Sequence, residues 1–109
     1  MKQFAFSKNE KVVMTPDGAQ RRVLSYGGGL MLVRFDFAAG VTSYTHSHPH
    51  EQIGYVVLGE IECCIDGQPM VRLGEGDSYY VAGGVMHHIV TKSPTILVDS
   101  FTPQRNDFL

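Results

Sequence analysis

The sequence lacks the apolar segments and the charge runs that mark membrane, secreted or nucleic-acid-binding proteins. No stretch approaches the roughly 20 apolar residues of a membrane span, and residues 1–11 have no apolar core of the kind found in a secretory signal. Nine basic residues stand against eleven acidic ones, for a formal charge of -2, and no basic run is present. We therefore expect a cytoplasmic protein that has neither nucleic acid nor a membrane as its partner.

Cysteine is scarce, and no long helical period occurs. Cys63 and Cys64 are adjacent, so on a strand they face opposite ways, and we expect two reduced thiols. Short apolar segments at nearly regular intervals, separated by turn residues, predict an all-β antiparallel barrel or sandwich. With 109 residues, 43% of them apolar, we expect one domain over residues 1–109.

The turn signals divide the chain into predicted strands. These cover residues 11–14, 20–25, 30–37, 53–58, 60–65, 70–73, 78–81, 86–90 and 95–102. The tail, 103–109, is compatible with a short helical turn or with a strand that packs on a neighbour. Because strands 20–25 and 30–37 are long and apolar-faced, an uncovered edge there would favour association, and we expect a homodimer.

The histidines carry the clearest chemical signal. His46 and His48 lie two residues apart, so on a strand both imidazoles point to one face. If the next strand pairs beside the first, the amide oxygen of Gln52 reaches the same point, and His87 offers a third imidazole. Three neutral imidazoles and one amide oxygen suit a divalent transition metal with open positions. Glu51 is the rival fourth ligand, since a one-residue slip in the turn would present a carboxylate instead.

The remaining two histidines are predicted to lie outside this site. His50 follows Pro49 in the turn, and His88 points away from His87 on the same strand.

These spacings resemble the two signature motifs of the cupin superfamily. The matching positions are Gly40, His46, His48, Gln52 and Gly59 in the first motif, and Gly76, 82–84, His87 and Thr91 in the second. Gln52 replaces the usual glutamate, and Ala82 and Thr91 depart from proline and asparagine. Losing the proline makes the turn before His87 less rigidly preset. The resemblance implies a single-domain jelly-roll β-barrel, and Gln52 rather than Glu51 preserves the distance to Gly59.

The glutamine changes the expected chemistry of the metal. A neutral amide with three neutral imidazoles leaves the full dipositive charge to act on a substrate, so the site would favour an anionic ligand such as a carboxylate. This ligand set accepts nickel, zinc, iron, manganese or cobalt.

A narrower resemblance covers nearly the whole chain. Residues 46–56 and 99–105 resemble the small KdgF-type cupins of pectin and alginate breakdown. That resemblance implies conversion of 4,5-unsaturated monouronates to the linear 4-deoxy-5-keto form, by ring opening and tautomerisation. Such a reaction needs a grip on the carboxylate, polarisation near C5 and an acid/base group.

The last strand offers residues for these roles. Asp99 and Phe101 lie two apart and face one way, with Leu97 extending that face into the barrel. We expect Asp99 to transfer the proton, Phe101 to wall the sugar ring and Arg105 to clamp a substrate oxygen or carboxylate. The alternative is a structural Asp99–Arg105 salt bridge with Phe101 as simple core.

Three further arginines are weaker candidates for binding an anion. Solvated strand faces or intersubunit salt bridges explain Arg21, Arg22 and Arg34 more simply, and they are left out of the predicted site.

Two other classes of function remain compatible with the motifs. A three-histidine cupin can be a metal-dependent dioxygenase, which requires a redox-active metal and consumes oxygen. It can also be a non-catalytic sugar-binding module whose metal only holds a ligand.

Overall fold

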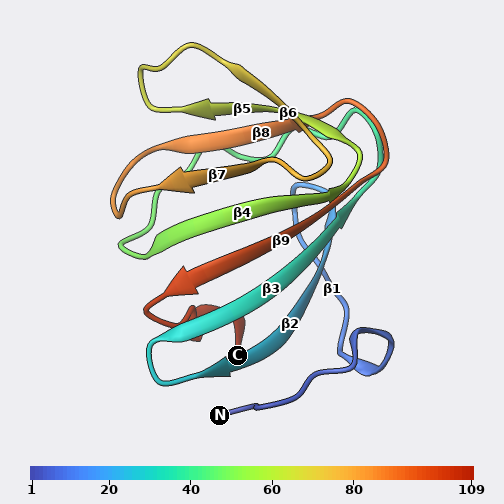
Figure 1. Ribbon diagram of the computed structural model, residues 1–109, viewed down its shortest axis with the longest axis vertical. Helices are drawn as coiled ribbons and strands as arrows, with labels where there is room; N and C mark the ends of the chain where they lie inside the picture. Colours follow the sequence, from blue (N-terminus) through green and yellow to red (C-terminus); the bar gives the residue numbers. More distant parts are fainter.

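The computed structural model describes residues 1–109, which form two facing antiparallel sheets (Figure 1). The larger sheet has the strand order β1-β2-β3-β9-β4-β7 and the smaller one β6-β5-β8. The strands are β1 (Val13–Met14), β2 (Ala19–Gly27), β3 (Leu30–Phe37), β4 (Glu51–Leu58), β5 (Glu60–Ile65), β6 (Val71–Gly74), β7 (Ser78–Val81), β8 (His87–Thr91) and β9 (Thr95–Thr102). Two short 3-10 turns, η1 (Ser7–Asn9) and η2 (Asn106–Phe108), complete the structure.

The inner faces of the two sheets supply the core. Val56 and Leu97 from the larger sheet pack against Ile61, Cys63 and Ile89 from the smaller one. Because burying an aliphatic side chain stabilises a fold by about 1.5–3 kcal/mol, this layer holds the sheets together. The all-β jelly-roll barrel predicted from the sequence is confirmed.

Most predicted strands are confirmed to within two residues at each end, and β3, β5, β7 and β9 match at both ends. The C-terminal tail resolves to the helical alternative, η2, whose Phe108 packs edge-on against Phe35 and Phe101. Neither helical turn has the length or the apolar character of a membrane-crossing helix.

The segment that carries His46 and His48 differs from its prediction. It forms no regular strand and pairs with β8 through isolated bridges, Thr42↔Val90 and His46↔His87. It does not pair with β4, because β9 and β7 already occupy the two edges of that strand. The predicted pairing was wrong, although the amide of Gln52 still reaches the histidines by a different route.

The two cysteines follow their prediction. Both are free thiols. Burial raises the pKa of Cys63 to about 11, so this residue is a neutral part of the core at physiological pH.

The first edge of the larger sheet is partly covered by the N-terminal residues. Lys2 exchanges two backbone hydrogen bonds with Tyr26, of 2.8 and 3.0 Å, and β1 pairs with the start of β2. The free edge that motivated a homodimer is therefore shorter than expected. Exposed apolar side chains lie instead on the outer face of β4, at Ile53, Tyr55 and Val57.

The homodimer stays a prediction. Light scattering at micromolar concentration should give twice the mass of 12.1 kDa. A monomeric mass at that concentration would contradict it.

Gly54 lies where β4 passes closest to a tyrosine of β7. A methyl group at Gly54 would overlap the Tyr79 ring and lie 2.5 Å from the Asp99 Oδ1 atom. A glycine inside a strand often marks such a close approach of neighbouring groups. The absent side chain therefore makes the room in which Tyr79 reaches Asp99.

We expect Gly54→Ala to lower the free energy of unfolding by about 1–3 kcal/mol, because the added methyl would displace the partly buried Tyr79 ring from its packed position. Gly74→Ala is the matched control, since Gly74 is also a strand glycine but its added Cβ would meet only ordinary contact at 3.9 Å. Urea unfolding of both variants gives the comparison. Equal stability of Gly54→Ala and the wild type would contradict this account.

Candidate metal centre

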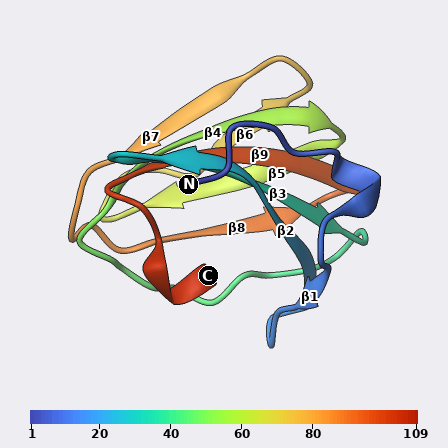
Figure 2. The same cartoon turned by 90° about the horizontal axis from the view of Figure 1, so that it is seen from below.

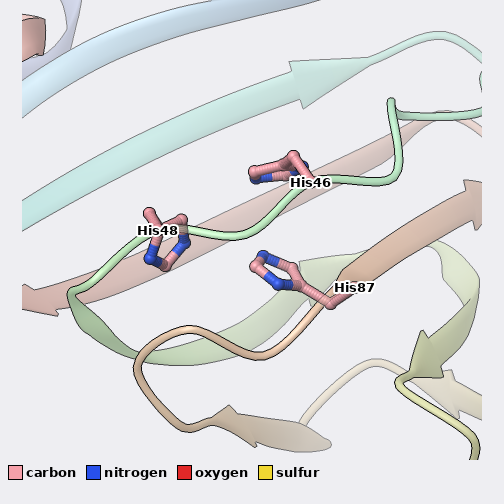
Figure 3. A group of neighbouring side chains, drawn as sticks. All are labelled: His46, His48 and His87. Atoms are coloured by element: carbon pink, nitrogen blue, oxygen red, sulfur yellow. The ribbon is translucent and has the colours of Figure 1, made fainter.

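Three imidazoles converge on one point, two of them buried (His48 and His87) and one exposed (His46). His46 and His48 project from the segment before β4, and His87 comes from the first residue of β8 (Figure 3). Their candidate ligand atoms all lie within 4.8 Å of one another, and the ring centroids of His46 and His87 are 4.4 Å apart. The cluster can therefore hold a single metal ion. His50 and His88 are outside it, in agreement with the sequence prediction.

Backbone carbonyls fix the tautomer of each histidine. The Nδ1 atoms of His46, His48 and His87 lie 2.7, 2.9 and 2.9 Å from the carbonyl oxygens of Tyr44, His50 and Val85. A carbonyl oxygen can only accept, so each Nδ1 must carry the proton and donate it. Every Nε2 atom is left with its lone pair, which is the form that a metal requires.

Two departures from the cupin motif have local explanations. The buried Thr91 hydroxyl donates to the Ala38 carbonyl at 2.6 Å and accepts from the Val41 amide at 2.9 Å, so it anchors the loop that leads to His46. Where proline is missing, the Gly84 amide donates to the His48 carbonyl at 2.7 Å. Tertiary contacts thus hold these two segments in the conformation that the usual motif residues would favour locally.

Gln52 faces the histidines and Glu51 does not. The alternation of β4 buries Gln52, while Glu51 lies on the exposed face and accepts a hydrogen bond from the Tyr80 hydroxyl at 3.2 Å. The Gln52 Oε1 atom lies 2.9 Å from the His48 Nε2 atom, and the Gln52 Nε2 atom donates to Asp99 Oδ2 at 3.0 Å. This geometry supports Gln52 rather than Glu51 as the fourth ligand.

The donor atoms fit a cation on electrostatic grounds. The hydrogen bond to Asp99 sets the Gln52 amide so that its oxygen meets the lone pair of His48 Nε2. Two acceptors 2.9 Å apart repel unless a positive charge lies beside them. The Nε2 atom of His87 is buried without any hydrogen-bond partner, which is costly for a polar atom unless a ligand satisfies it.

Burial favours the neutral form of two of these imidazoles. It lowers the pKa of His87 to about 4 and lowers that of His48, against the raising effect of the backbone carbonyls. The neutral imidazole is the metal-binding form, so His48 and His87 have no proton to displace near pH 7.

Asp99 is a further buried polar group of the site. It is 4% exposed on β9, and burial raises its pKa to about 7, partly offset by two hydrogen bonds. Gln52 donates one of these bonds, and the Tyr79 hydroxyl donates the other to Oδ1 at 3.1 Å. No ion pair involves Asp99, so the alternative of a structural bridge to Arg105 was wrong.

Arg105 pairs with Asp107 instead. Its Nε and Nη2 atoms donate to the two carboxylate oxygens at 3.0 and 2.9 Å, and the guanidinium carbon lies 5.1 Å from the ring centroid of Phe101. This pairing lowers the pKa of Asp107. Because the Nη1 atom makes no contact with Asp107, Arg105 still has donors to offer a ligand.

One cavity of about 260 Å³ brings these groups together. Its walls include His46, His87, Gln52, Asp99, Phe101 and Arg105. Figure 2 shows the C-terminal turn on the same side of the larger sheet as the segment that carries the histidines, where His50 Nε2 donates to the Gln104 carbonyl at 3.2 Å.

The sequence pattern assigned no role in the site to two residues that line the cavity. Tyr79 was not singled out, although Gly54, its partner in the β4–β7 register, is a glycine inside an apolar strand and could have signalled a close neighbour. Arg21 was set aside with Arg22 and Arg34, yet it shares its strand face with Ala19 and Val23 rather than with Arg22.

A two-sheet antiparallel barrel with three convergent imidazoles defines a class of protein. Residues 33–101 match the family model described as "Cupin domain", and this chain belongs to the cupin family. Within that family it is similar to the pectin degradation protein KdgF of Dickeya dadantii (strain 3937), with 37% identity over 95 residues, 85% of this chain and 86% of the relative.

Solved structures extend the similarity to the whole chain. KdgF from Halomonas sp. has a TM-score of 0.90 and 32% identity over 97% of this chain and 99% of that one. An RmlC-like cupin from Shewanella frigidimarina NCIMB 400 has a TM-score of 0.93 and 35% identity over 100% of this chain and 97% of that one. Both resemblances stated from the sequence are thereby confirmed.

We predict that the amount of metal kept by single-residue variants identifies the ligands. His87→Ala and Gln52→Ala should each weaken retention of a divalent ion by about tenfold or more, because each removes a donor atom. Glu51→Ala is the matched control and should retain the metal like the wild type. Elemental analysis after dialysis against a weak chelator gives the measurement, and loss of metal from Glu51→Ala alone would contradict the assignment.

Proposed function

We propose that this protein converts 4,5-unsaturated monouronates, released by lysis of pectin or alginate, to the linear 4-deoxy-5-keto uronate. The observation that carries the proposal is Asp99, a buried carboxyl group that faces the same cavity as Gln52 and two of the three histidines, His46 and His87. The similarity to two KdgF proteins, one of them named for pectin degradation, supports it independently.

The proposed reaction is an isomerisation that needs no co-reactant. The hemiacetal opens when the bond between C1 and the ring oxygen breaks and the C1 hydroxyl loses its proton. This leaves an aldehyde at C1 and, after protonation of the ring oxygen, an enol at C5. Transfer of the enol proton to C4 then gives the C5 ketone, so atoms and charge balance.

Asp99 is the proposed proton-transfer residue. Both of its oxygens are oriented, one by the Tyr79 hydroxyl and one by the Gln52 amide. Each oxygen retains a second lone pair, so the carboxyl group can still accept or return a proton. A fixed carboxyl group in a largely apolar cavity loses little orientation on approach to the transition state.

The histidines and Gln52 are proposed to hold one divalent transition metal. When bound, such an ion would supply a positive charge that polarises a substrate oxygen. His46, His48 and His87 would present their Nε2 lone pairs to it, and Gln52 its amide oxygen.

Phe101 and Arg105 complete the proposed site. The buried Phe101 lies edge-on to His48, with 5.7 Å between ring centroids, and offers an apolar wall to a sugar ring. Arg105 is the proposed clamp on a substrate oxygen or carboxylate, through the donors that Asp107 leaves free.

The proposal predicts that an unsaturated monouronate loses its ultraviolet absorbance when mixed with the metal-loaded protein. Asp99→Ala should lower turnover by on the order of a hundredfold or more, the usual scale for a positioned acid/base group. Arg105→Ala should raise KM more than it lowers kcat, because a clamp acts in the ground state as well.

Thermal stability and metal content have to be measured on the same two variants. Asp99→Ala frees the Gln52 amide, so loss of metal must be separated from loss of proton transfer. A folded, metal-loaded Asp99→Ala protein with near wild-type turnover would end the catalytic role. Oxygen uptake in place of uronate turnover would favour a dioxygenase instead.

A further inference from the structure

The three arginines that the sequence left undecided have different environments. Arg22 and Arg34 both pair with Asp36, at 3.2 and 2.7 Å, on the outer face of the sheet. Arg21 makes no ion pair, lines the same cavity as His46 and His87, and has a buried Nε atom without a hydrogen-bond partner. Arg21 is thus a cation aimed at the candidate site with donors left over.

Strand register explains why only Arg21 turns inward. Arg21 stands opposite Phe35 in the β2–β3 pair, and directly opposite residues share a face of the sheet. Phe35 lines the same cavity. Arg22, one residue on, stands opposite Arg34 and faces outward with it.

The C-terminal turn brings a second arginine to the same place. The guanidinium carbons of Arg21 and Arg105 lie 4.0 and 4.2 Å from the ring centroid of Phe108. Stacking on one aromatic ring orients both planar groups while leaving their in-plane N–H donors available. Each guanidinium fork offers parallel donors that match the shape of a carboxylate.

No acid at this end of the cavity forms an ion pair with Arg21. The carboxylate of Asp107 is committed to Arg105, and it is the acid that acts on Arg21 from nearby. Two further acids line the cavity, and other donors satisfy both. Asp17 accepts hydrogen bonds from the Thr15 hydroxyl and the Tyr44 amide, and Asp99 accepts them from the Gln52 amide and the Tyr79 hydroxyl.

We infer that Arg21 is a second carboxylate-binding residue, acting with Arg105 on the carboxylate of a uronate. This inference rests on the proposed function and deepens it. Arg21 and Arg105 distinguish a uronate from the neutral sugar of the same shape, because only the uronate has a carboxylate that can pair with the unpaired guanidinium of Arg21. Arg21 is a binding residue here and takes no part in proton transfer.

The competing explanation is that Arg21 only packs on Phe108. If Arg21 only packs its flat guanidinium on Phe108, replacing Arg21 should change the binding of charged and neutral ligands equally. If Arg21 binds a carboxylate, removing its charge should weaken the binding of charged ligands alone.

The test measures binding of D-galacturonate and D-galactose by calorimetry. Galacturonate has no C4–C5 double bond, so it cannot react by the proposed route and reports binding alone. Zinc-loaded and chelator-stripped wild type are both titrated, which separates arginine contacts from any contact with the metal. The variants are Arg21→Gln, which keeps length but removes charge, and Arg22→Gln, the matched control on the outer face.

Arg21→Gln should weaken galacturonate binding by about tenfold or more, the scale of one lost hydrogen bond between charged groups, in both zinc-loaded and stripped protein. Galactose binding should not change. Arg22→Gln should bind galacturonate like the wild type. Equal weakening for both sugars, or no weakening for galacturonate, would overturn the inference, as would a wild type that does not bind galacturonate.

A conservative variant covers the case in which Arg21→Gln does not fold. Arg21→Lys keeps the charge but replaces the fork with a point charge, so galacturonate binding should weaken several-fold while galactose binding is unchanged. Unchanged galacturonate affinity would then overturn the inference.

The inference and the proposed function fail separately. If Arg21→Gln selectively loses galacturonate but the wild type does not convert an unsaturated uronate, the binding site stands and the reaction does not. If the wild type converts the uronate while Arg21→Gln binds galacturonate normally, the reaction stands and the role of Arg21 does not.

Discussion

The orientation of one side-chain amide controls the chemistry of the cavity. Asp99 accepts the Gln52 N–H and thereby turns the Gln52 oxygen toward His48. If the amide flipped, its N–H would donate to His48 Nε2 and no oxygen would be left for a metal, while the amide oxygen would face the Asp99 carboxylate. The candidate metal ligand and the candidate acid/base group are therefore parts of one hydrogen-bonded unit.

This unit is costly to bury, and the surrounding strands are adapted to it. A carboxyl group in an apolar interior destabilises a fold unless donors satisfy it. Tyr79 supplies one donor from β7, and it can do so only because Gly54 has no side chain between them. Strand β4 thus supports Asp99 in two ways: Gly54 leaves room for the Tyr79 hydroxyl to reach it, and Gln52 donates its amide to it.

Sequence reasoning predicted features that depend on local pattern. The alternation of β9 placed Leu97, Asp99 and Phe101 on one inward face, and motif spacing gathered the three histidines. It failed where the answer depended on which strands pair across the barrel. The segment before β4 pairs with β8 because both edges of β4 are occupied, which no local pattern reveals.

The arginines illustrate the same limit. The sequence near Arg21, Arg22 and Arg34 does not show which of them forms an ion pair, since Asp36 is within reach of any of them on a sheet. The distinction comes from the register of β2 against β3. It also comes from the C-terminal turn, which brings Arg105 and Phe108 back over the sheet. The order in which distant segments meet decides which arginine is neutralised and which faces the cavity.

The same reasoning explains why glutamine replaces the glutamate of the cupin motif. A glutamate at position 52 would set a carboxylate oxygen where the Gln52 Nε2 atom now lies, 3.0 Å from the Asp99 oxygen. Two carboxylates at that distance do not both ionise, so the pair would share one proton. A glutamate ligand is therefore compatible with this cavity only if Asp99 is absent or permanently neutral. The amide resolves the conflict, because it donates to Asp99 with one end and offers a lone pair to the histidine cluster with the other. The departure at position 52 and the buried carboxyl group at position 99 are thus two consequences of one electrostatic constraint.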